Sequence, residues 1–209
     1  MKKRYIIALI SFLIFLIITI LVVTKNTISF DETIYQFLIK LRSPFFDTFF
    51  KTITKLANPI PVIILLAIFG IFLKRNDEIL LSTNVLITLL MNQLLKHIIQ
   101  RPRPDHLRLI KESGYSYPSG HSMIAACLYA TLIYIILKRI KDKKIKRLLI
   151  SLLTIIIILI GCSRIYVGVH YPSDILGGYF LTLSIIIVTS TITNNYLRGK
   201  KKYDKDGSK

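Results

Sequence analysis

Residues 163–174, between two long apolar runs, contain four side chains that could do chemistry together: the hydroxyl of Ser163, the guanidinium of Arg164, the imidazole of His170 and the carboxylate of Asp174. His170 and Asp174 are one helical turn apart, so the carboxylate can hold one ring nitrogen and leave the other free as a nucleophile or base. Arg164 suits a phosphate because its charge is permanent and its donors are planar. Taken alone, the stretch also fits an ordinary loop beside a membrane.

A second block opens an apolar run with Pro118, Ser119, Gly120 and His121. This order resembles a helix start, in which Ser119 caps and Gly120 lets another backbone or ligand approach closely. The first N–H groups of such a helix are free to bind an anion. His121 is then placed to protonate a leaving oxygen.

A third block consists of Lys96, which ends an apolar run, and Arg103-Pro104 seven residues later. Lys96, Arg103 and Arg164 could together surround the oxygens of a phosphoryl group, whose charge must be stabilised through the transition state. The three blocks therefore predict phosphoryl transfer, with His170 attacking phosphorus and Asp174 fixing the tautomer of its ring.

The composition indicates a membrane protein as the scaffold for these residues. Of 209 residues, 53% are hydrophobic and only 19% are charged, and the mean hydropathy is +0.57, which is unusual for a soluble domain. Six apolar runs are candidates to cross a bilayer. We therefore predict an all-α, polytopic fold with six transmembrane helices at residues 5–23, 59–73, 79–95, 122–137, 148–162 and 175–193.

Residues 28–57 have a different pattern, with apolar residues at helical spacing and Lys, Arg and Asp between them. Ser43-Pro44 ends one piece and can open the next, as N-cap and first helical residue. The pattern favours two amphipathic helices on the membrane surface, with a phenylalanine stripe at the acyl boundary: Phe45, Phe46, Phe49 and Phe50. An ordinary packed helical hairpin is the alternative.

The distribution of basic residues predicts the orientation. An even number of spans puts both termini on one side, and that side receives 18 of the 29 Lys and Arg, including a basic tail at 198–209 that we expect to be frayed. The positive-inside rule then makes the termini cytoplasmic and puts the three blocks on the extracytoplasmic face. The net charge of +18 does not indicate nucleic acid, because no DNA- or RNA-reading motif accompanies it.

Several polar residues inside the apolar runs suggest structural roles. Cys127 and Cys162 are expected to be free thiols rather than a disulfide or metal ligands. Asn84, Asn92 and Gln93 are expected to form hydrogen bonds between helices rather than to bind substrate.

The three blocks resemble the signature of the type 2 phosphatidic acid phosphatase family of integral membrane lipid phosphatases. The family pattern is Lys, six residues, Arg-Pro; then Pro-Ser-Gly-His; then Ser-Arg, five residues, His, three residues, Asp. Here it reads Lys96…Arg103-Pro104, Pro118-Ser119-Gly120-His121 and Ser163-Arg164…His170…Asp174, without departure. Size and the neighbourhood 112–118 are similar to small bacterial phosphatidylglycerophosphatase B and undecaprenyl-diphosphate phosphatase members.

The resemblance implies one lipid phosphatase domain over residues 1–209. It also implies a phosphohistidine at His170, general acid catalysis by His121, phosphate binding by Lys96, Arg103, Ser119, Gly120 and Arg164, and no metal or other cofactor. The expected partners are a lipid phosphate, foremost phosphatidylglycerol phosphate or undecaprenyl diphosphate, and membrane lipids.

A non-catalytic lipid-phosphate binder or transporter is the competing function. Binding requires the cations but not a nucleophile with its orienting carboxylate, so His170, Asp174 and His121 favour the enzyme. The sequence leaves open the oligomeric state, the choice between monophosphate and diphosphate, and the roles of Arg101, His106 and Arg108.

Overall fold

A computed structural model of the chain describes residues 2–105 and 107–206. The described part is built of α-helices joined by turns and one long loop, as predicted for an all-α protein. The helices are α1 (Lys2–Val23), α2 (Ile28–Ile39), α3 (Pro44–Lys55), α4 (Pro59–Phe72), α5 (Arg75–Ile99), α6 (Gly120–Arg139), α7 (Lys143–Tyr166) and α8 (Pro172–Asp206).

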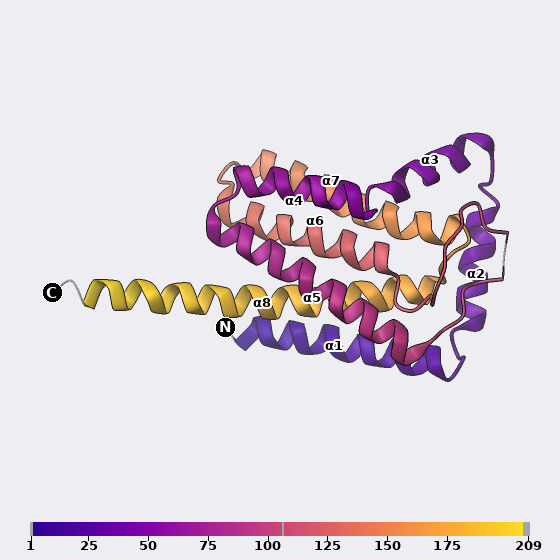
Figure 1. The fold of residues 1–209 in the computed structure, drawn as a ribbon, viewed down its shortest axis with the longest axis horizontal. Helices are drawn as coiled ribbons and strands as arrows, with labels where there is room; N and C mark the ends of the chain where they lie inside the picture. The colour runs from indigo at the N-terminus through magenta and orange to yellow at the C-terminus, as the bar shows by residue number, and fades with distance from the viewer. Residues whose placement is uncertain (1, 106, 207–209) are drawn as a thin grey trace.

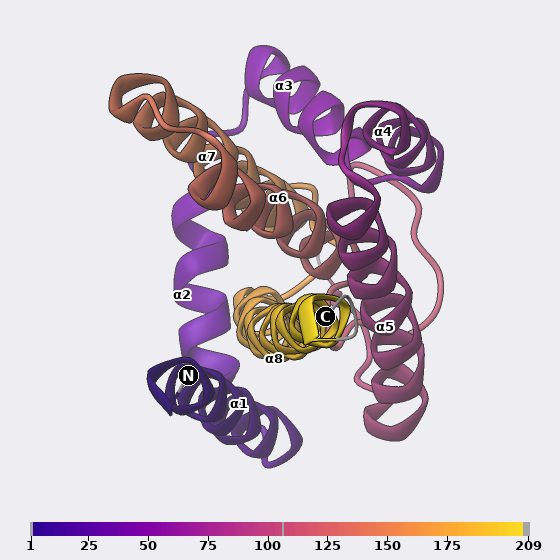
Figure 2. The ribbon, with the colours of Figure 1, turned by 90° about the vertical axis from the view of Figure 1, so that its left-hand side faces the viewer.

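Six helices, α1 and α4 to α8, run along the length of the molecule, while α2 lies across one end of this bundle and α3 rises obliquely beside it (Figure 1). Viewed down the bundle, α8 lies inside a ring formed by the other helices (Figure 2). The start of α1 and the last turns of α8 lie at the same end, and the α5–α6 loop lies at the other (Figure 1). This arrangement agrees with an even number of spans.

The predicted spans are confirmed, with one qualification in the second. Five helices are long and apolar enough to cross a membrane individually: α1, α5, α6, α7 and residues Pro172–Tyr196 of α8. The second predicted span, α4, has only 14 residues, about 21 Å at 1.5 Å per residue. It passes the test only together with α3, from which it is bent by 51°. The bent pair of α3 and α4 is therefore the candidate for the sixth span, in place of α4 alone.

Two predictions about the flanking segments need correction. Most of the phenylalanine stripe on α3 packs inward: Phe50 is 6% exposed and lies against Tyr166 of α7, with 4.4 Å between ring centroids, and only Phe45, 72% exposed, remains open. This inward face arises because α3 packs along α7. The basic tail is also not frayed from Arg198, since α8 continues to Asp206. Lysine is a good helix former and no proline interrupts this segment.

Buried amides connect the helices, as predicted for Asn84 and Asn92. Asn84 donates to Thr131 of α6 at 3.0 Å and accepts from Thr189 of α8. Asn92 donates to the carbonyl of Pro118 at 2.9 Å, so it also positions the start of α6. The two cysteines are free thiols, as expected.

The α5–α6 loop is held against the α7–α8 turn by backbone contacts. The Leu109 N–H donates to the Val167 carbonyl at 3.0 Å, and the Ser119 N–H donates to the Asp174 carbonyl, in the first turn of α8, at 3.2 Å. Gly168 has a φ of +78°, and a Cβ there would approach the Leu107 carbonyl oxygen to 2.7 Å. Glycine is therefore required where the loop and the turn meet.

Candidate active site

His170 lies on the short turn between α7 and α8, and Asp174 lies in the first turn of α8. Nδ1 of His170 is 3.2 Å from Oδ2 of Asp174. The same carboxylate oxygen accepts the Tyr171 N–H at 3.0 Å, and the His170 N–H donates to the carbonyl of Arg164 at 3.3 Å. Both side chains are buried, at 2% and 0% exposure. Ring and carboxylate are thus held in one orientation.

The other nitrogen of the ring, Nε2, faces Arg103. Nη1 of Arg103 is 3.1 Å from Nε2 of His170 and 2.9 Å from the Val169 carbonyl oxygen. A guanidinium can only donate, so Nε2 accepts and Nδ1 carries the proton toward Asp174. Arg103 also donates to the carbonyls of Ser113 and Gly114. The loop therefore fixes the guanidinium beside the nitrogen that holds the lone pair.

Arg164 is buried deeply, at 1% exposure. Nη1 donates to the Thr54 hydroxyl of α3 at 2.7 Å, and Nη2 donates to Oε1 of Glu112 at 2.6 Å. Its Nε has no hydrogen-bond partner among the described residues. A buried unpaired donor on a cation is costly unless a ligand satisfies it, so Arg164 is equipped to receive an anion.

Glu112 bridges two of the cations in this ligand-free arrangement. Its second oxygen, Oε2, lies 3.7 Å from Nη2 of Arg103. Burial raises the pKa of Glu112. The positive charges of Arg164, then of His121 and Arg103, lower it by more, so the net pKa lies below its ordinary value. The site thus holds an ionised carboxylate between Arg164 and Arg103, where a phosphate would also be attracted.

Lys96 reaches the same region from the end of α5, where Nζ donates to the Tyr115 carbonyl at 2.6 Å. At the start of α6, Ser119 is the N-cap, and its hydroxyl accepts from the Ser122 N–H at 3.5 Å. A Cβ on Gly120 would lie 3.1 Å from Oδ1 of Asn92, so the space there is tight. The predicted cap is present, and the close neighbour of Gly120 is the Asn92 side chain.

His121, in the first turn of α6, is oriented by the break between α3 and α4. Its Nε2 lies 2.8 Å from Oδ1 of Asn58, the residue before α4. An amide oxygen only accepts, so Nε2 of His121 carries a proton. The 51° bend thus has a local role, because it brings Asn58 to His121 and Thr54 to Arg164.

Burial and the surrounding cations both affect the ionisation of His170. Burial lowers its pKa well below the ordinary value of 6.5, and positive charge on four neighbours lowers it further: Arg164, Arg103, Lys96 and His121. An imidazole in this environment stays neutral and keeps its lone pair near physiological pH.

The sequence did not reveal that Arg101 connects two buried carboxylates, those of Asp174 and Asp31. Nη1 of Arg101 donates to Oδ1 of Asp174 at 2.6 Å, and its Nη2 donates to Oδ2 of Asp31, in α2, at 2.8 Å. Asp31 also accepts from the N–H and hydroxyl of Ser173, each at 2.8 Å. Burial lowers the pKa of Arg101, but Asp174 and Asp31 raise it to a net value above the ordinary one.

The position of Asp31 overturns the expectation that the polar residues of α2 face water, since Asp31 is 2% exposed. The signal available in the sequence was Arg101, two residues before a motif arginine. The remaining open residues differ: Arg108 donates to the Pro104 carbonyl within its own loop, and His106 lies outside the described residues.

Taken together, the site offers a neutral imidazole with a fixed tautomer, a second imidazole carrying a proton, and guanidinium and ammonium groups around them. These groups can attack, protonate and stabilise a tetrahedral anion, which is the set of tasks in phosphoryl transfer.

Comparison with known proteins agrees with this chemistry. Residues 78–198 match the PAP2 superfamily, and this range includes all three motif blocks. The chain is 34% identical over 196 residues to phosphatidylglycerophosphatase B of Bacillus subtilis (strain 168), covering 91% of this chain and 97% of that protein. It is 28% identical over 189 residues to an undecaprenyl-diphosphatase of Sulfolobus acidocaldarius, covering 86% of each.

The fold has a solved counterpart. The crystal structure of a transmembrane PAP2-type phosphatidylglycerolphosphate phosphatase from Bacillus subtilis superposes with a TM-score of 0.82 at 33% sequence identity. The superposition covers 90% of this chain and 96% of that one.

Proposed function

The chain belongs to the PAP2 superfamily, and on that premise we propose that it is a membrane lipid phosphatase that removes the terminal phosphate of phosphatidylglycerol phosphate, undecaprenyl diphosphate or both. The names of the two relatives compared above support these substrates. The single observation that carries the mechanism is the ring of His170, held by Asp174 on one nitrogen and facing Arg103 with the other.

In the first step, the lone pair on Nε2 of His170 attacks phosphorus. The new N–P bond forms as the bond from phosphorus to the leaving oxygen breaks, and His121, acting as an imidazolium, gives one of its two ring protons to that oxygen and becomes neutral. The imidazole becomes cationic while it carries the phosphoryl group, and Asp174 stabilises that charge through Nδ1–H.

In the second step, a water molecule attacks phosphorus and gives a proton to His121. The N–P bond breaks, which restores neutral His170 and releases inorganic phosphate. Arg103, Arg164 and Lys96 hold the phosphoryl oxygens in both steps, where the charge is spread over them. The unpaired Nε of Arg164 supports its assignment to this task. Ser119 and Gly120 complete the cradle at the start of α6.

The test is phosphate release from a panel of lipid phosphates and diphosphates in detergent. We expect turnover by the wild type and no turnover by His170→Ala. His97→Ala is the matched control, because His97 is exposed and bonds the Gln93 carbonyl in its own helix. An acid-labile, base-stable phosphoenzyme should form in the wild type only. Binding of these lipids without phosphate release by the wild type would instead support a binder or transporter.

We further propose that residues 1–209 form one six-span domain with cytoplasmic termini and an extracytoplasmic active site. The basic excess on the side of the termini supports this orientation. Single cysteines at Ser113 and Lys143, in a chain whose Cys127 and Cys162 are replaced by alanine, test it. An impermeant thiol reagent should label position 113 in intact cells and spare position 143. The reverse pattern would overturn the orientation without affecting the proposed chemistry.

A further inference from the structure

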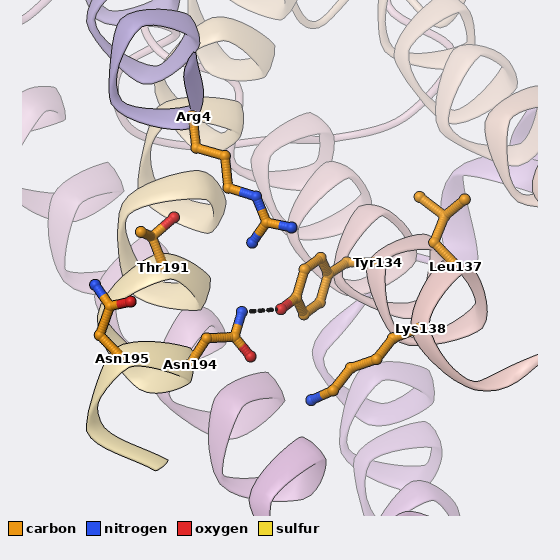
Figure 3. A pocket seen from close by; sticks show the side chains of 7 residues that line it. All are labelled: Arg4, Tyr134, Leu137, Lys138, Thr191, Asn194 and Asn195. Atoms are coloured by element: carbon orange, nitrogen blue, oxygen red, sulfur yellow. Dashed lines mark hydrogen bonds between the residues drawn. The ribbon is translucent and has the colours of Figure 1, made fainter. Parts of the chain in front are cut away.

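A cavity of about 440 Å³ lies between α1, α6 and α8, at the end of the bundle opposite the active site. This volume is within the range of small-molecule sites. Its lining combines two basic side chains with amide and hydroxyl groups: Arg4, Tyr134, Leu137, Lys138, Thr191, Asn194 and Asn195 (Figure 3). No Asp or Glu is among these lining residues, so the cavity has a local excess of positive charge.

The charged groups of the cavity are weakly engaged. Arg4 lies over the Tyr134 ring at 6.0 Å from its centroid, the outer limit for a cation–π contact, and this ring is its partner among the described side chains. Lys138 is 3.4 Å from Asp77, but Arg139 contacts that carboxylate more closely, at 2.5 and 2.8 Å. Lys138 and Arg139 thus share one carboxylate, which leaves a net positive charge beside the cavity.

Tyr134 holds the middle of the cavity. Its hydroxyl accepts a hydrogen bond from Nδ2 of Asn194, and the charged ends of Arg4 and Lys138 lie on either side of it (Figure 3). An anion bound in the cavity beside the Tyr134 hydroxyl would meet both cations, together with the hydrogen-bonding groups of Asn194 and Asn195.

We propose that this cavity binds the head group of an anionic phospholipid. Basic pockets between transmembrane helices at one membrane face are suited to phosphate-bearing head groups. A lipid rather than a free phosphate is favoured because the cavity opens beside apolar surface: Leu137, in its lining, is 55% exposed, and Ile192 of α8 is 56% exposed. The acyl chains would lie along these helices while the head group occupies the cavity.

The test compares lipid affinities by native mass spectrometry of the detergent-solubilised full chain, titrated with phosphatidylglycerol or phosphatidylcholine. The Arg4→Gln/Lys138→Gln variant should bind phosphatidylglycerol about tenfold more weakly than the wild type. The matched control is Lys141→Gln/Lys144→Gln, which removes the same charge from two exposed positions, one between α6 and α7 and one in the first turn of α7. Both variants keep the active site, so lipid bound there contributes equally to both.

A second variant guards against a mere loss of folding. Asn194→Asp is isosteric, keeps a partner for the Tyr134 hydroxyl and puts an anion between the two cations, so it should also weaken phosphatidylglycerol binding while the melting temperature stays near that of the wild type. Equal phosphatidylglycerol affinity in the double variant and its control would overturn the site. Displacement of the lipid by millimolar inorganic phosphate would overturn the assignment to a lipid in favour of free phosphate.

Discussion

The guanidinium of Arg103 donates to Nε2 of His170 across 3.1 Å, so the proposed nucleophilic nitrogen is engaged before substrate arrives. The contact sets the ring tautomer and also occupies the lone pair that must attack phosphorus. An incoming phosphoryl group resolves this conflict, because its oxygens are better acceptors for the guanidinium than a neutral imidazole. Substrate binding and release of the nucleophile are therefore one event.

Arg103→Lys should lower kcat/KM by about 10²–10³-fold, the range for removing a donor from a charge-stabilising site. Lysine keeps the charge but cannot contact the loop carbonyls, His170 and phosphate at once. Arg108→Lys is the control, since Arg108 bonds only the Pro104 carbonyl among the described residues. Steady-state kinetics on a lipid phosphate would measure both, and equal losses in the two variants would contradict a specific role for Arg103.

The pH dependence of kcat/KM should show an acid limb with a midpoint below 6.5. His170 must be neutral to attack, and burial together with the surrounding cations lowers its pKa, so activity is lost only as pH falls through that lowered value. The measured profile must be corrected for the ionisation of the substrate phosphate. Arg103→Gln removes a positive neighbour and should move the midpoint upward. A corrected wild-type midpoint at or above 6.5 would contradict the prediction.

Arg101→Gln should reduce both stability and turnover, because it leaves Asp31 and Asp174 buried without their shared cation. Breaking such a pair typically costs about 3–5 kcal/mol. Adding Asp31→Asn should recover part of the melting temperature but not the turnover, since Asp174 still lacks its cation. Arg75→Gln, at an exposed pair with Glu78, is the control. Full recovery of turnover in the double variant would reduce Arg101 to a purely structural residue.

Glu112→Gln should tighten inhibition by vanadate on the order of tenfold, because the competing carboxylate between Arg164 and Arg103 is then neutral. The inhibition constant of vanadate against a lipid phosphate reports this directly. Glu78→Gln is the control, because Glu78 lies in the first turn of α5, at the end of that helix away from Lys96 and the site. Unchanged inhibition in Glu112→Gln would show that this carboxylate does not compete with the anion.

The elements that could be predicted from the sequence are those marked by a pattern of neighbouring residues. The spans follow from uninterrupted apolar runs, and the approach of Lys96, Arg103, His121 and His170 follows from the ends of those runs meeting at one membrane face. The cap at Ser119 is likewise a local signal.

The missed residues depend on tertiary packing. Thr54 and Asn58 reach Arg164 and His121 only because α3 and α4 are bent against each other. In the sequence, Asp31 resembles a solvent-facing residue of an amphipathic helix. It is buried against Arg101 because α2 lies across the end of the bundle. No spacing in the chain connects these residues to the motifs.

Because α4 is short, the thickness of the bilayer can affect the geometry of the active site. Its length of about 21 Å falls short of a hydrocarbon core of about 30 Å, and mismatch of this kind is relieved by tilt or by local thinning of the lipid. The hinge at its end holds Asn58, which orients His121. We therefore expect membranes of different acyl-chain length to change the tilt of α4 and, with it, the contact between Asn58 and His121.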